Sequence, residues 1–310
     1  MREKAISVGS KHVSGGLRKT LHEHRSKYLM LAPFTIIFLV FTVFPVVASL
    51  VLSMTSFNML EWPEFVLFDN YINLFVYDDV FLIALKNTLF FAAVTGPVSY
   101  LMCFGFAWII NNFSPRLRAL LTLIFYAPSI SGNAYMVWQL IFSSDSRGYA
   151  NAILMNLGIL DEPILWLQTK AYVMPILIVV QLWLSLGVSF LTFIAGFQNV
   201  DRSLYEAGSI DGVSNRWQEL WHITLPAMKP QLMLGSVMQI TSSFSVGAIS
   251  MELAGFPSVE YAGHTLLTHM QDYGVTRMEM GYASAIATVL FFMMVFSNLA
   301  VQKLLRKVGS

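Results

Sequence analysis

The chain has little charge and almost no cysteine. Only 12% of its 310 residues are charged and 56% are hydrophobic, whereas soluble domains carry roughly 25% charged residues. The net charge of +1 gives no basis for binding nucleic acid. The single cysteine, Cys103, lies inside an apolar run, which excludes a disulfide framework and a paired-cysteine metal site. We expect Cys103 to be a small core residue.

The sequence also lacks the motifs of enzymes. It contains neither the His-Glu-x-x-His pattern of a metalloprotease nor a phosphate-binding loop. The nearest match to such a loop, residues 15–20, has no glycine before its lysine, and we interpret it as a basic juxtamembrane tail. His264 and His269 are five residues apart, which does not put them on one helix face, and we interpret them as loop residues. We therefore expect a non-enzymatic chain that binds no metal or cofactor itself.

Long apolar runs dominate what remains. A helix needs about 20 apolar residues to cross a bilayer, and six runs qualify: 29–54, 83–110, 119–142, 172–197, 231–251 and 282–301. Most contain glycine, proline or serine, which membrane helices tolerate where neighbouring helices satisfy the backbone. The sequence predicts an all-α polytopic membrane protein with six transmembrane helices. The first span is too long for a signal peptide and is expected to be retained.

Lysine and arginine are unevenly distributed between the loops. They gather in the N-terminal tail, in the loops after the second and fourth spans and in the C-terminal tail, whereas the alternate loops are acidic. By the positive-inside rule both termini and loop 198–230 face the cytoplasm. We predict a basic tail (1–28), a first transmembrane helix with an external loop (29–82), a core of five transmembrane helices including loop 198–230 (83–301), and a second cytoplasmic tail (302–310).

Loop 198–230 is polar, although both of its neighbours are apolar spans. Glu206 and Ala207 start a helix-forming stretch, and Gly212 permits a turn that other residues resist. Ser214 or Asn215 can cap a second helix, which Pro226 is expected to end. One face of that helix is formed by Trp217, Leu220 and Trp221. An aromatic and apolar stripe presented to the cytoplasm indicates docking onto another protein.

The span interiors are almost free of ionisable residues. Charges inside a membrane persist mainly for function, and an ion-coupled carrier usually has a carboxylate there. Without such a group, and without a nucleotide-binding motif, the energy for any transport has to come from a partner. Loop 198–230 is the natural contact for that partner.

The loop resembles a motif of a known family. The matching residues are Glu206-Ala207-Gly208, Gly212 and Ile223-x-Leu225-Pro226. They are similar to the EAA loop of permease subunits in binding-protein-dependent ABC importers, whose fold is the type I importer permease.

Flanking segments extend the resemblance over nearly the whole chain. They are Asn87-Thr88-Leu89; Tyr126-Ala127-Pro128, Trp138 and Gly148-x-x-Asn151; Trp183, Phe190-Leu191 and Ala195-Gly196-Phe197-Gln198; Gly281-Tyr282-Ala283-Ser284-Ala285; and residues 25–57, with Pro45 and a closing Ser53-Met54-Thr55-Ser56-Phe57. Together they favour the carbohydrate branch, of the MalF/LacF type. The resemblance implies a multi-pass protein of the bacterial cytoplasmic membrane.

The resemblance also implies a mechanism. The chain would form half of a heterodimeric pore with a second homologous permease. Two ATP-binding subunits would bind ATP and magnesium, and an extracytoplasmic solute-binding protein would deliver the saccharide. The implied coupling residues are Glu206, Ala207, Gly208, Asp211, Gly212, Trp217, Leu220, Trp221, Ile223, Leu225 and Pro226. Among them the acidic residues dock, Gly212 turns, the apolar face packs on the ATPase, and the last three anchor the loop to the fifth span.

Three features depart from the family pattern. Gly208 replaces the usual alanine, which should loosen the first loop helix by at most about 1 kcal/mol. Ten residues separate Gly212 from Ile223, where many members have nine. The external loop at 253–257 lacks the usual glycine run before its proline.

The substrate path is expected in the fourth and fifth spans, because saccharides bind to aromatic faces and hydrogen-bonding side chains. The candidates are Gln181, Trp183, Ser185, Gln239, Ser242, Ser243 and Phe244, with Ser189, Thr241 and Ser245 in the same polar stretches and Trp138 and Gln139 further out. The alternative is that these hydroxyl groups pack between helices and that Trp138 belongs to an interfacial belt.

The absence of a cationic cluster in the spans favours a neutral saccharide over glycerol phosphate. Two other classes stay open from the residues alone. An ion-coupled carrier would transport unaided, and a membrane scaffold would bind partners without transport.

Overall fold

The computed structural model describes residues 25–306, which form two compact units divided between residues 51 and 52. In the first unit α2 (Arg25–Phe38), the π-helical turn η1 (Leu39–Val43) and α3 (Phe44–Leu52) follow one another without a break. Their length and apolar composition suit a membrane span. Residues 1–24 and 307–310, with the basic run at 15–20, lie outside the described residues.

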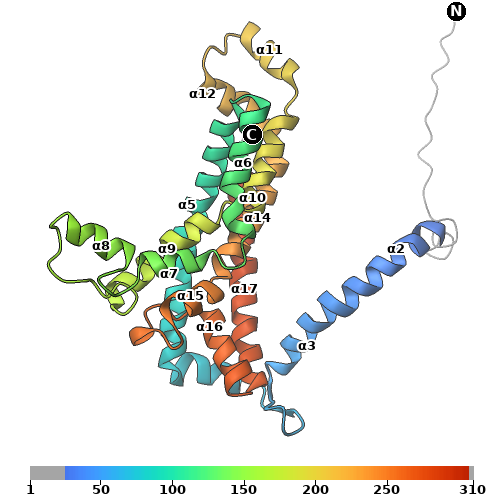
Figure 1. Cartoon of the computed structure of the whole chain (residues 1–310). Helices are drawn as coiled ribbons and strands as arrows, with labels where there is room; N and C mark the ends of the chain where they lie inside the picture. The colour runs from blue at the N-terminus through green and yellow to red at the C-terminus, as the bar shows by residue number, and fades with distance from the viewer. Residues whose placement is uncertain (1–24, 307–310) are drawn as a thin grey trace, which may run out of the picture. The chain divides into compact units, whose positions relative to one another are not determined.

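The second unit is a helical bundle with a small hairpin at one end (Figure 1). Its elements before the polar loop are β1 (Thr55–Ser56), β2 (Glu64–Phe65), α4 (Asp69–Ile72), η2 (Asn73–Tyr77), α5 (Asp79–Asn111), α6 (Pro115–Ile130), α7 (Tyr135–Ile141), α8 (Tyr149–Asn156), α9 (Lys170–Leu184) and α10 (Val188–Asn199). After the loop come α14 (Lys229–Phe244), α15 (Gly247–Ala254), η4 (Val259–Tyr261), α16 (Leu266–Gln271), η5 (Asp272–Thr276) and α17 (Met280–Leu305). β1 and β2 pair antiparallel, with Thr55 opposite Phe65. The helical fold class is confirmed. The second unit begins at Leu52 and so includes the segment predicted as the external loop after the first span.

The expected six spans correspond to five long apolar helices and one bent pair. The long helices are Ser26–Leu52, Asp79–Asn111, Lys170–Asn199, Lys229–Ala254 and Met280–Leu305. The third predicted span, 119–142, is not straight, because α6 ends at Ile130 and α7 turns away by 84°. Ser131 and Gly132 lie at this break, where glycine weakens helix propagation.

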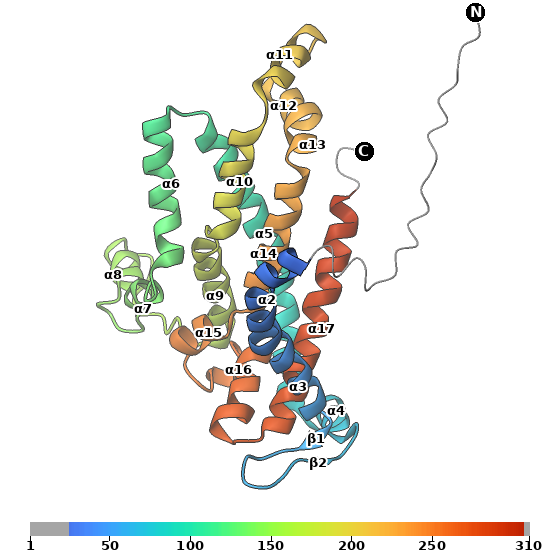
Figure 2. The same cartoon turned by 90° about the vertical axis from the view of Figure 1, so that its right-hand side faces the viewer.

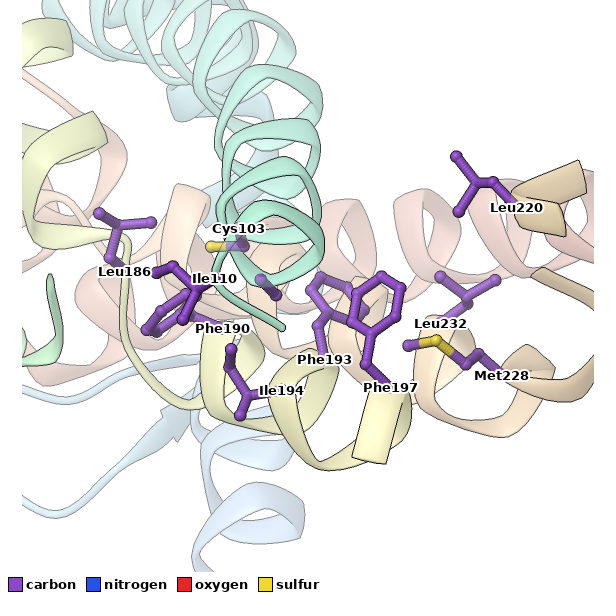
Figure 3. Close-up of a cluster of buried hydrophobic side chains, with 11 residues drawn as sticks. Cys103, Ile110, Leu186, Phe190, Phe193, Ile194, Phe197, Leu220, Met228 and Leu232 are labelled. Atoms are coloured by element: carbon purple, nitrogen blue, oxygen red, sulfur yellow. The ribbon is translucent and has the colours of Figure 1, made fainter. Parts of the chain in front are cut away.

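The half of the bundle nearest loop 198–230 is held by an aromatic core between α5, α10 and α14 (Figure 3). The ring of Phe193 on α10 meets Tyr100 and Phe104 of α5 edge-on, at centroid distances of 5.3 and 5.7 Å. Cys103 is fully buried in this cluster, as expected for a core residue. Burying such aromatic side chains stabilises the contact between α5 and α10 by several kcal/mol in total, at about 1.5–3 kcal/mol for each large apolar side chain.

Gly235 lets α14 approach this core closely. A Cβ added at Gly235 would lie 2.5 Å from Cζ of Phe193, a ring that Tyr100 and Phe104 hold on the other side. We expect Gly235→Ala to destabilise the protein by about 1–3 kcal/mol through overpacking, measured as a lower thermal unfolding midpoint in detergent. Gly105→Ala on α5 is the matched control, because its added Cβ meets nothing within 4 Å. An unchanged midpoint for Gly235→Ala would contradict this packing.

Candidate functional site

Loop 198–230 forms a helical hairpin at the end of the bundle opposite α16 (Figures 1 and 2). Its elements are α11 (Arg202–Ile210), α12 (Arg216–Glu219), the π-helical turn η3 (Leu220–Thr224) and α13 (Leu225–Ala227). Asp201 caps α11 by accepting from the N–H of Ser203 at 3.0 Å. That hydrogen bond lowers the pKa of the Asp201 carboxyl. Gly212, at φ +93°, makes the predicted turn between the two helices.

The second loop helix is capped as the sequence predicts. Asn215 Oδ1 accepts from the N–H of Gln218 at 2.9 Å, while Gln218 Oε1 accepts from the N–H of Ser214 at 2.9 Å. These reciprocal bonds satisfy donors that a helix start leaves free. The start of α12 is therefore fixed by side chains from the loop itself.

Loop 198–230 is tied to itself and to the bundle. The Thr224 hydroxyl donates to the Glu219 carbonyl at 3.2 Å, so the Tyr205 hydroxyl is the donor in its 2.9 Å bond to Thr224 Oγ1. Gly208 is buried beneath Ile223, because a Cβ at Gly208 would lie 2.5 Å from Ile223 Cδ1. The glycine that replaces the usual alanine thus permits a close contact between α11 and η3. These contacts make the hairpin one packed body.

The predicted apolar stripe is divided between two sides of the helix. Trp217 and Trp221 are 63% and 62% exposed, whereas Leu220 is 5% exposed and belongs to the aromatic core. The prediction that Leu220 docks onto a partner was wrong. Leu220 begins the π-helical turn η3, where the direction of the side chains changes from that of α12. Trp217 also contacts Trp108 of α5, with ring centroids 5.0 Å apart.

The remaining loop residues are likewise either exposed to solvent or packed against the bundle. Glu206, Ala207 and Asp211 are exposed, as docking residues must be. Leu225 packs against the aromatic core, consistent with an anchor. Sequence analysis missed Ile210, which ends α11 and is 86% exposed. The sequence feature that could have identified Ile210 is its position as an apolar residue directly before the Asp211-Gly212 turn.

Pro226 does not end the second loop helix as expected. The helical backbone continues through η3 into α13, and Pro226 lies in the first turn of α13. Proline has no N–H to donate to the turn before it. The π-helical turn directly before it widens the backbone at that point. α14 then begins at Lys229, so the loop leads directly into the fifth span.

The predicted substrate-path residues do not meet in one cavity. Gln181 Nε2 donates to Ser242 Oγ at 3.0 Å, and the buried Ser185 donates to Leu182 O within its own helix. Three others line a cavity of about 540 Å³ between α5, α14 and α17: Gln239, Ser243 and Phe244. Trp183 lines a different cavity of about 480 Å³, beside Trp138 at a ring-centroid distance of 5.6 Å. Gln181 and Ser242 therefore fit the alternative of interhelical packing, whereas the Ser185 hydroxyl is bonded locally.

A polar face of α14 is exposed instead. Thr241 and Ser245 are exposed, four residues apart, and their hydroxyl groups donate only to carbonyls of their own helix, at 2.9 and 2.8 Å. The helix of this span is interrupted at Ser245, between the end of α14 and the start of α15. Exposed hydroxyl groups at an interrupted span suit a water-filled path better than lipid.

The end of the bundle opposite the loop is held together by the carboxylate of Asp78, whose side chain is 11% exposed. Asp78 caps α5 by accepting from the N–H of Phe81 at 2.8 Å, and its Oδ2 accepts from the Tyr282 hydroxyl at 2.9 Å and from His269 Nε2 at 3.0 Å. Burial alone would raise the pKa of Asp78, but the hydrogen bonds from His269, Phe81 and Tyr282 outweigh it. They hold the pKa of Asp78 well below its usual range.

The two histidines near this carboxylate are core residues. His269 lies on α16 and His264 just before it; both are buried, with His264 Nε2 3.1 Å from His269 Nδ1. Their interpretation as loop residues was wrong for His269 and missed the burial of both. Because His269 Nε2 donates to Asp78, its Nδ1 is free to accept from His264 when both rings are neutral. Among the described residues no group of three or more metal-ligand side chains converges, here or elsewhere.

Three residues that the family resemblance singled out, Asn87, Thr88 and Gly281, lie at this same end of the bundle. Asn87 Nδ2 donates to the carbonyls of Tyr261 and His264, each at 2.9 Å, and Thr88 Oγ1 accepts from the N–H of Leu266 at 2.9 Å. These bonds join α5 to the segment before α16. Gly281 allows β1 to lie directly against α17, since a Cβ there would fall 2.0 Å from the Thr55 carbonyl oxygen.

Stability is expected to fall in mild acid because of His264. Burial, and to a lesser extent the neighbouring His269, lower the pKa of His264 to about 4 against the opposing charges of Asp272 and Asp78. The unfolded chain, with a His pKa of about 6.5, then binds the proton more tightly than the folded protein. The stabilisation is complete above about pH 6.5 and is lost as the pH falls towards 4.

The measurement is the thermal unfolding midpoint between pH 7 and pH 4.5. His264→Gln should flatten its dependence on pH. His222→Gln, at an exposed position of loop 198–230, should leave the slope as in the wild type. Equal slopes for all three proteins would contradict the role of His264.

Comparisons with known proteins agree with this architecture. A model of the family described as the inner membrane component of binding-protein-dependent transport systems matches residues 23–310. The chain is 34% identical to the probable ABC transporter permease YesP of Bacillus subtilis, covering 88% of each chain. It is 31% identical to the arabinooligosaccharide permease AraP of B. subtilis, covering 89% of this chain and 87% of that one. It is 32% identical to the lactose permease LacF of Rhizobium radiobacter, covering 85% and 87%.

Solved structures give the same result. A chain of the bacterial ABC transporter that imports the acidic polysaccharide alginate superposes with a TM-score of 0.76 at 25% identity, covering 95% of this chain and 99% of that one. A bacterial alginate ABC transporter has also been solved in complex with an alginate-pentasaccharide-bound periplasmic protein, and a chain of that complex has the same fold, with a TM-score of 0.74 at 24% identity, covering 95% of this chain and 99% of that one.

Proposed function

The chain belongs to the family of inner membrane components of binding-protein-dependent transport systems, and we propose that it is the permease subunit of an ATP-driven importer of a sugar or oligosaccharide. The observation that carries this proposal is the packed hairpin of loop 198–230, which exposes Trp217, Trp221 and Ile210 at one end of a membrane bundle. The names of the lactose and arabinooligosaccharide relatives support the saccharide and disfavour glycerol phosphate or an ion-coupled carrier.

The proposed partners are a second homologous permease, two ATP-binding subunits that carry ATP and magnesium, and an extracytoplasmic solute-binding protein. The alginate transporter's complex with its periplasmic protein supports the last of these. This chain would be the non-catalytic subunit, with hydrolysis on the ATP-binding subunits.

Loop 198–230 would transmit the movement of the ATPase. Its internal contacts, from Tyr205 to Thr224 and from Gly208 to Ile223, let it move as one body. Glu206 and Asp211 would make polar contacts, and Trp217, Trp221 and Ile210 would pack in an ATPase cleft. Because Leu220 and Leu225 are packed in the aromatic core, a displacement of the hairpin would be passed to α10 and α14. This is the differential contact that a switch between two states requires.

The substrate path would follow the exposed face of α14. We expect Ser245→Leu to lower uptake about tenfold, the effect of about 1.4 kcal/mol on a barrier, without loss of assembly. Thr192→Leu is the matched control, since Thr192 also donates only within its own helix but lies on α10. Uptake in proteoliposomes, compared at equal protein content, measures both. If Ser245→Leu transports as well as Thr192→Leu, the path does not follow this face.

The complete importer tests the proposal as a whole. The tagged chain is purified from its native membrane in mild detergent, and the proteins recovered with it are identified by mass spectrometry. We expect a second permease, an ATP-binding subunit and a binding protein, with ATP hydrolysis stimulated by a saccharide-loaded binding protein. Transport by this chain alone, or its recovery without an ATP-binding subunit under conditions that preserve known complexes, would contradict the proposal.

A further inference from the structure

A cavity of about 960 Å³ lies between loop 198–230 and the bundle. It is lined by the end of α5, by α6 and α10, and by α11 and α12 of the loop. Three arginines from three helices line it, Arg118 of α6, Arg202 of α11 and Arg216 of α12, and the only carboxylate in its lining is Glu219. An excess of guanidinium groups on one cavity favours an anion, and their planar forks match phosphate oxygens.

The guanidinium group of Arg118 is held by two hydrogen bonds, but its Nε makes none. Its Nη1 donates to Asn111 Oδ1 at 3.2 Å and its Nη2 to the Phe113 carbonyl at 3.3 Å. Its Nε and the hydroxyl of Thr122, one turn along α6, are buried without a hydrogen-bond partner among the described residues. A buried donor without a partner costs about 1–3 kcal/mol. Both residues line the cavity, so a bound acceptor would relieve that cost after a small side-chain movement.

The rest of the lining is that of a membrane boundary. Trp108 and Tyr126 are amphipathic aromatic residues, and Leu123, Ile194 and Phe197 form an apolar part of the wall. The cavity lies where spans meet the loop that the positive-inside rule assigns to the cytoplasm. Basic pockets between spans at that level suit the head groups of anionic lipids.

We propose that this cavity binds a phosphate ester anion, supplied by an anionic phospholipid whose acyl chains follow the apolar wall. The phosphate bridges Arg118, at the end of a span, to Arg202 and Arg216, on the loop. None of these arginines belongs to the docking or path residues described above. A ligand that joins the loop to the bundle strengthens the connection through which ATPase movement reaches the spans, so lipid composition sets the efficiency of coupling.

The experiment uses the assembled importer in nanodiscs of phosphatidylcholine, with and without phosphatidylglycerol. Native mass spectrometry counts the phosphatidylglycerol retained after detergent release, and thermal unfolding gives the stabilisation. The variant is Arg118→Gln with Arg202→Gln. The matched control is Arg116→Gln, an exposed arginine two residues from Arg118 that does not line the cavity. Lipid retention is read whether or not the assembly transports, so its failure is distinct from that of the proposed function.

We expect the double variant to retain phosphatidylglycerol about 25-fold more weakly, because each of the two basic groups removed near the surface contributes roughly fivefold. The control is expected to match the wild type. In a second arm, inorganic phosphate is added to nanodiscs of phosphatidylcholine alone. Stabilisation there, lost in the double variant, supports the same site with a soluble phosphate as its ligand. Equal lipid retention by all three proteins together with no response to phosphate, or an equal loss in the control, overturns the proposal.

Discussion

Replacing Gly212 with proline is expected to abolish uptake while leaving the chain in the membrane. Gly212 has φ +93°, and proline fixes φ near −65°. The turn also depends on the N–H of Val213 donating to the Gly208 carbonyl at 2.9 Å. A hairpin that cannot close at this turn cannot hold α11 against η3, so Trp217 and Ile210 lose their relative positions. The measurement is uptake in proteoliposomes, with chain content checked by immunoblot.

Gly212→Asn is the graded control for this result. Asparagine adopts positive φ more readily than other residues with a side chain, so this variant should keep part of the uptake. The order wild type, Asn, Pro is the expected result. If Gly212→Pro transports normally, the hairpin geometry is not needed for coupling.

Removing the carboxylate of Asp78 is expected to give the largest loss of stability. Asp78→Ala leaves the Phe81 N–H, His269 Nε2 and the Tyr282 hydroxyl without their acceptor. One helix cap is worth about 1 kcal/mol, and each buried donor left unpaired costs about 1–3 kcal/mol. The sum, about 3–7 kcal/mol for one cap and two unpaired donors, should lower the unfolding midpoint by about 6–28 °C, since 1 kcal/mol shifts larger domains by about 2–4 °C.

Asp79→Ala provides the control for this loss. Asp79 is the next residue, is exposed and begins α5, so the same change of charge is made without removing the hydrogen bonds. Only a small shift is expected for it. A similar shift for both variants would mean that charge at this end, rather than the bonds of Asp78, determines stability. Above the acid range the Asp78 contribution should be constant. It is lost only as the pH falls below about 4, because a folded-state pKa that is lowered stabilises above the unfolded value.

Much of the architecture follows from composition and local chemistry. Four of the five long helices enclose a predicted apolar run and extend beyond it at both ends, and the first overlaps most of its run. The cap at Asn215 and the turn at Gly212 follow from residue types with one strong local preference. The bend between α6 and α7 was not predicted, because the apolar run continues across Ser131 and Gly132. The hydropathy of a run indicates how many residues can lie in the membrane, but it does not indicate whether the helix is straight or bent.

The site was harder to predict, because polarity in a span says little about which way a side chain faces. Gln181 and Ser242 are polar because they bond to each other between two helices. Ser243 and Ser245 are two residues apart, yet one is buried and the other exposed. Long-range pairs were beyond any local pattern: His269 and Asp78 are 191 residues apart. Asn87 and Thr88 were found through a resemblance, and only the fold shows that they join α5 to the segment before α16.

Because Gly208 and Ile223 are in close contact, the effect of a substitution at one of these positions depends on the residue at the other. A methyl group at residue 208 collides only with the tip of Ile223, so alanine there becomes acceptable once residue 223 is shortened to valine, and each change alone is worse than the pair. A mutational scan of loop 198–230 that varies one position at a time would rate both positions as intolerant. Substitutions in the loop are therefore expected to be tolerated when two contacting residues, one on each helical segment of the hairpin, change together.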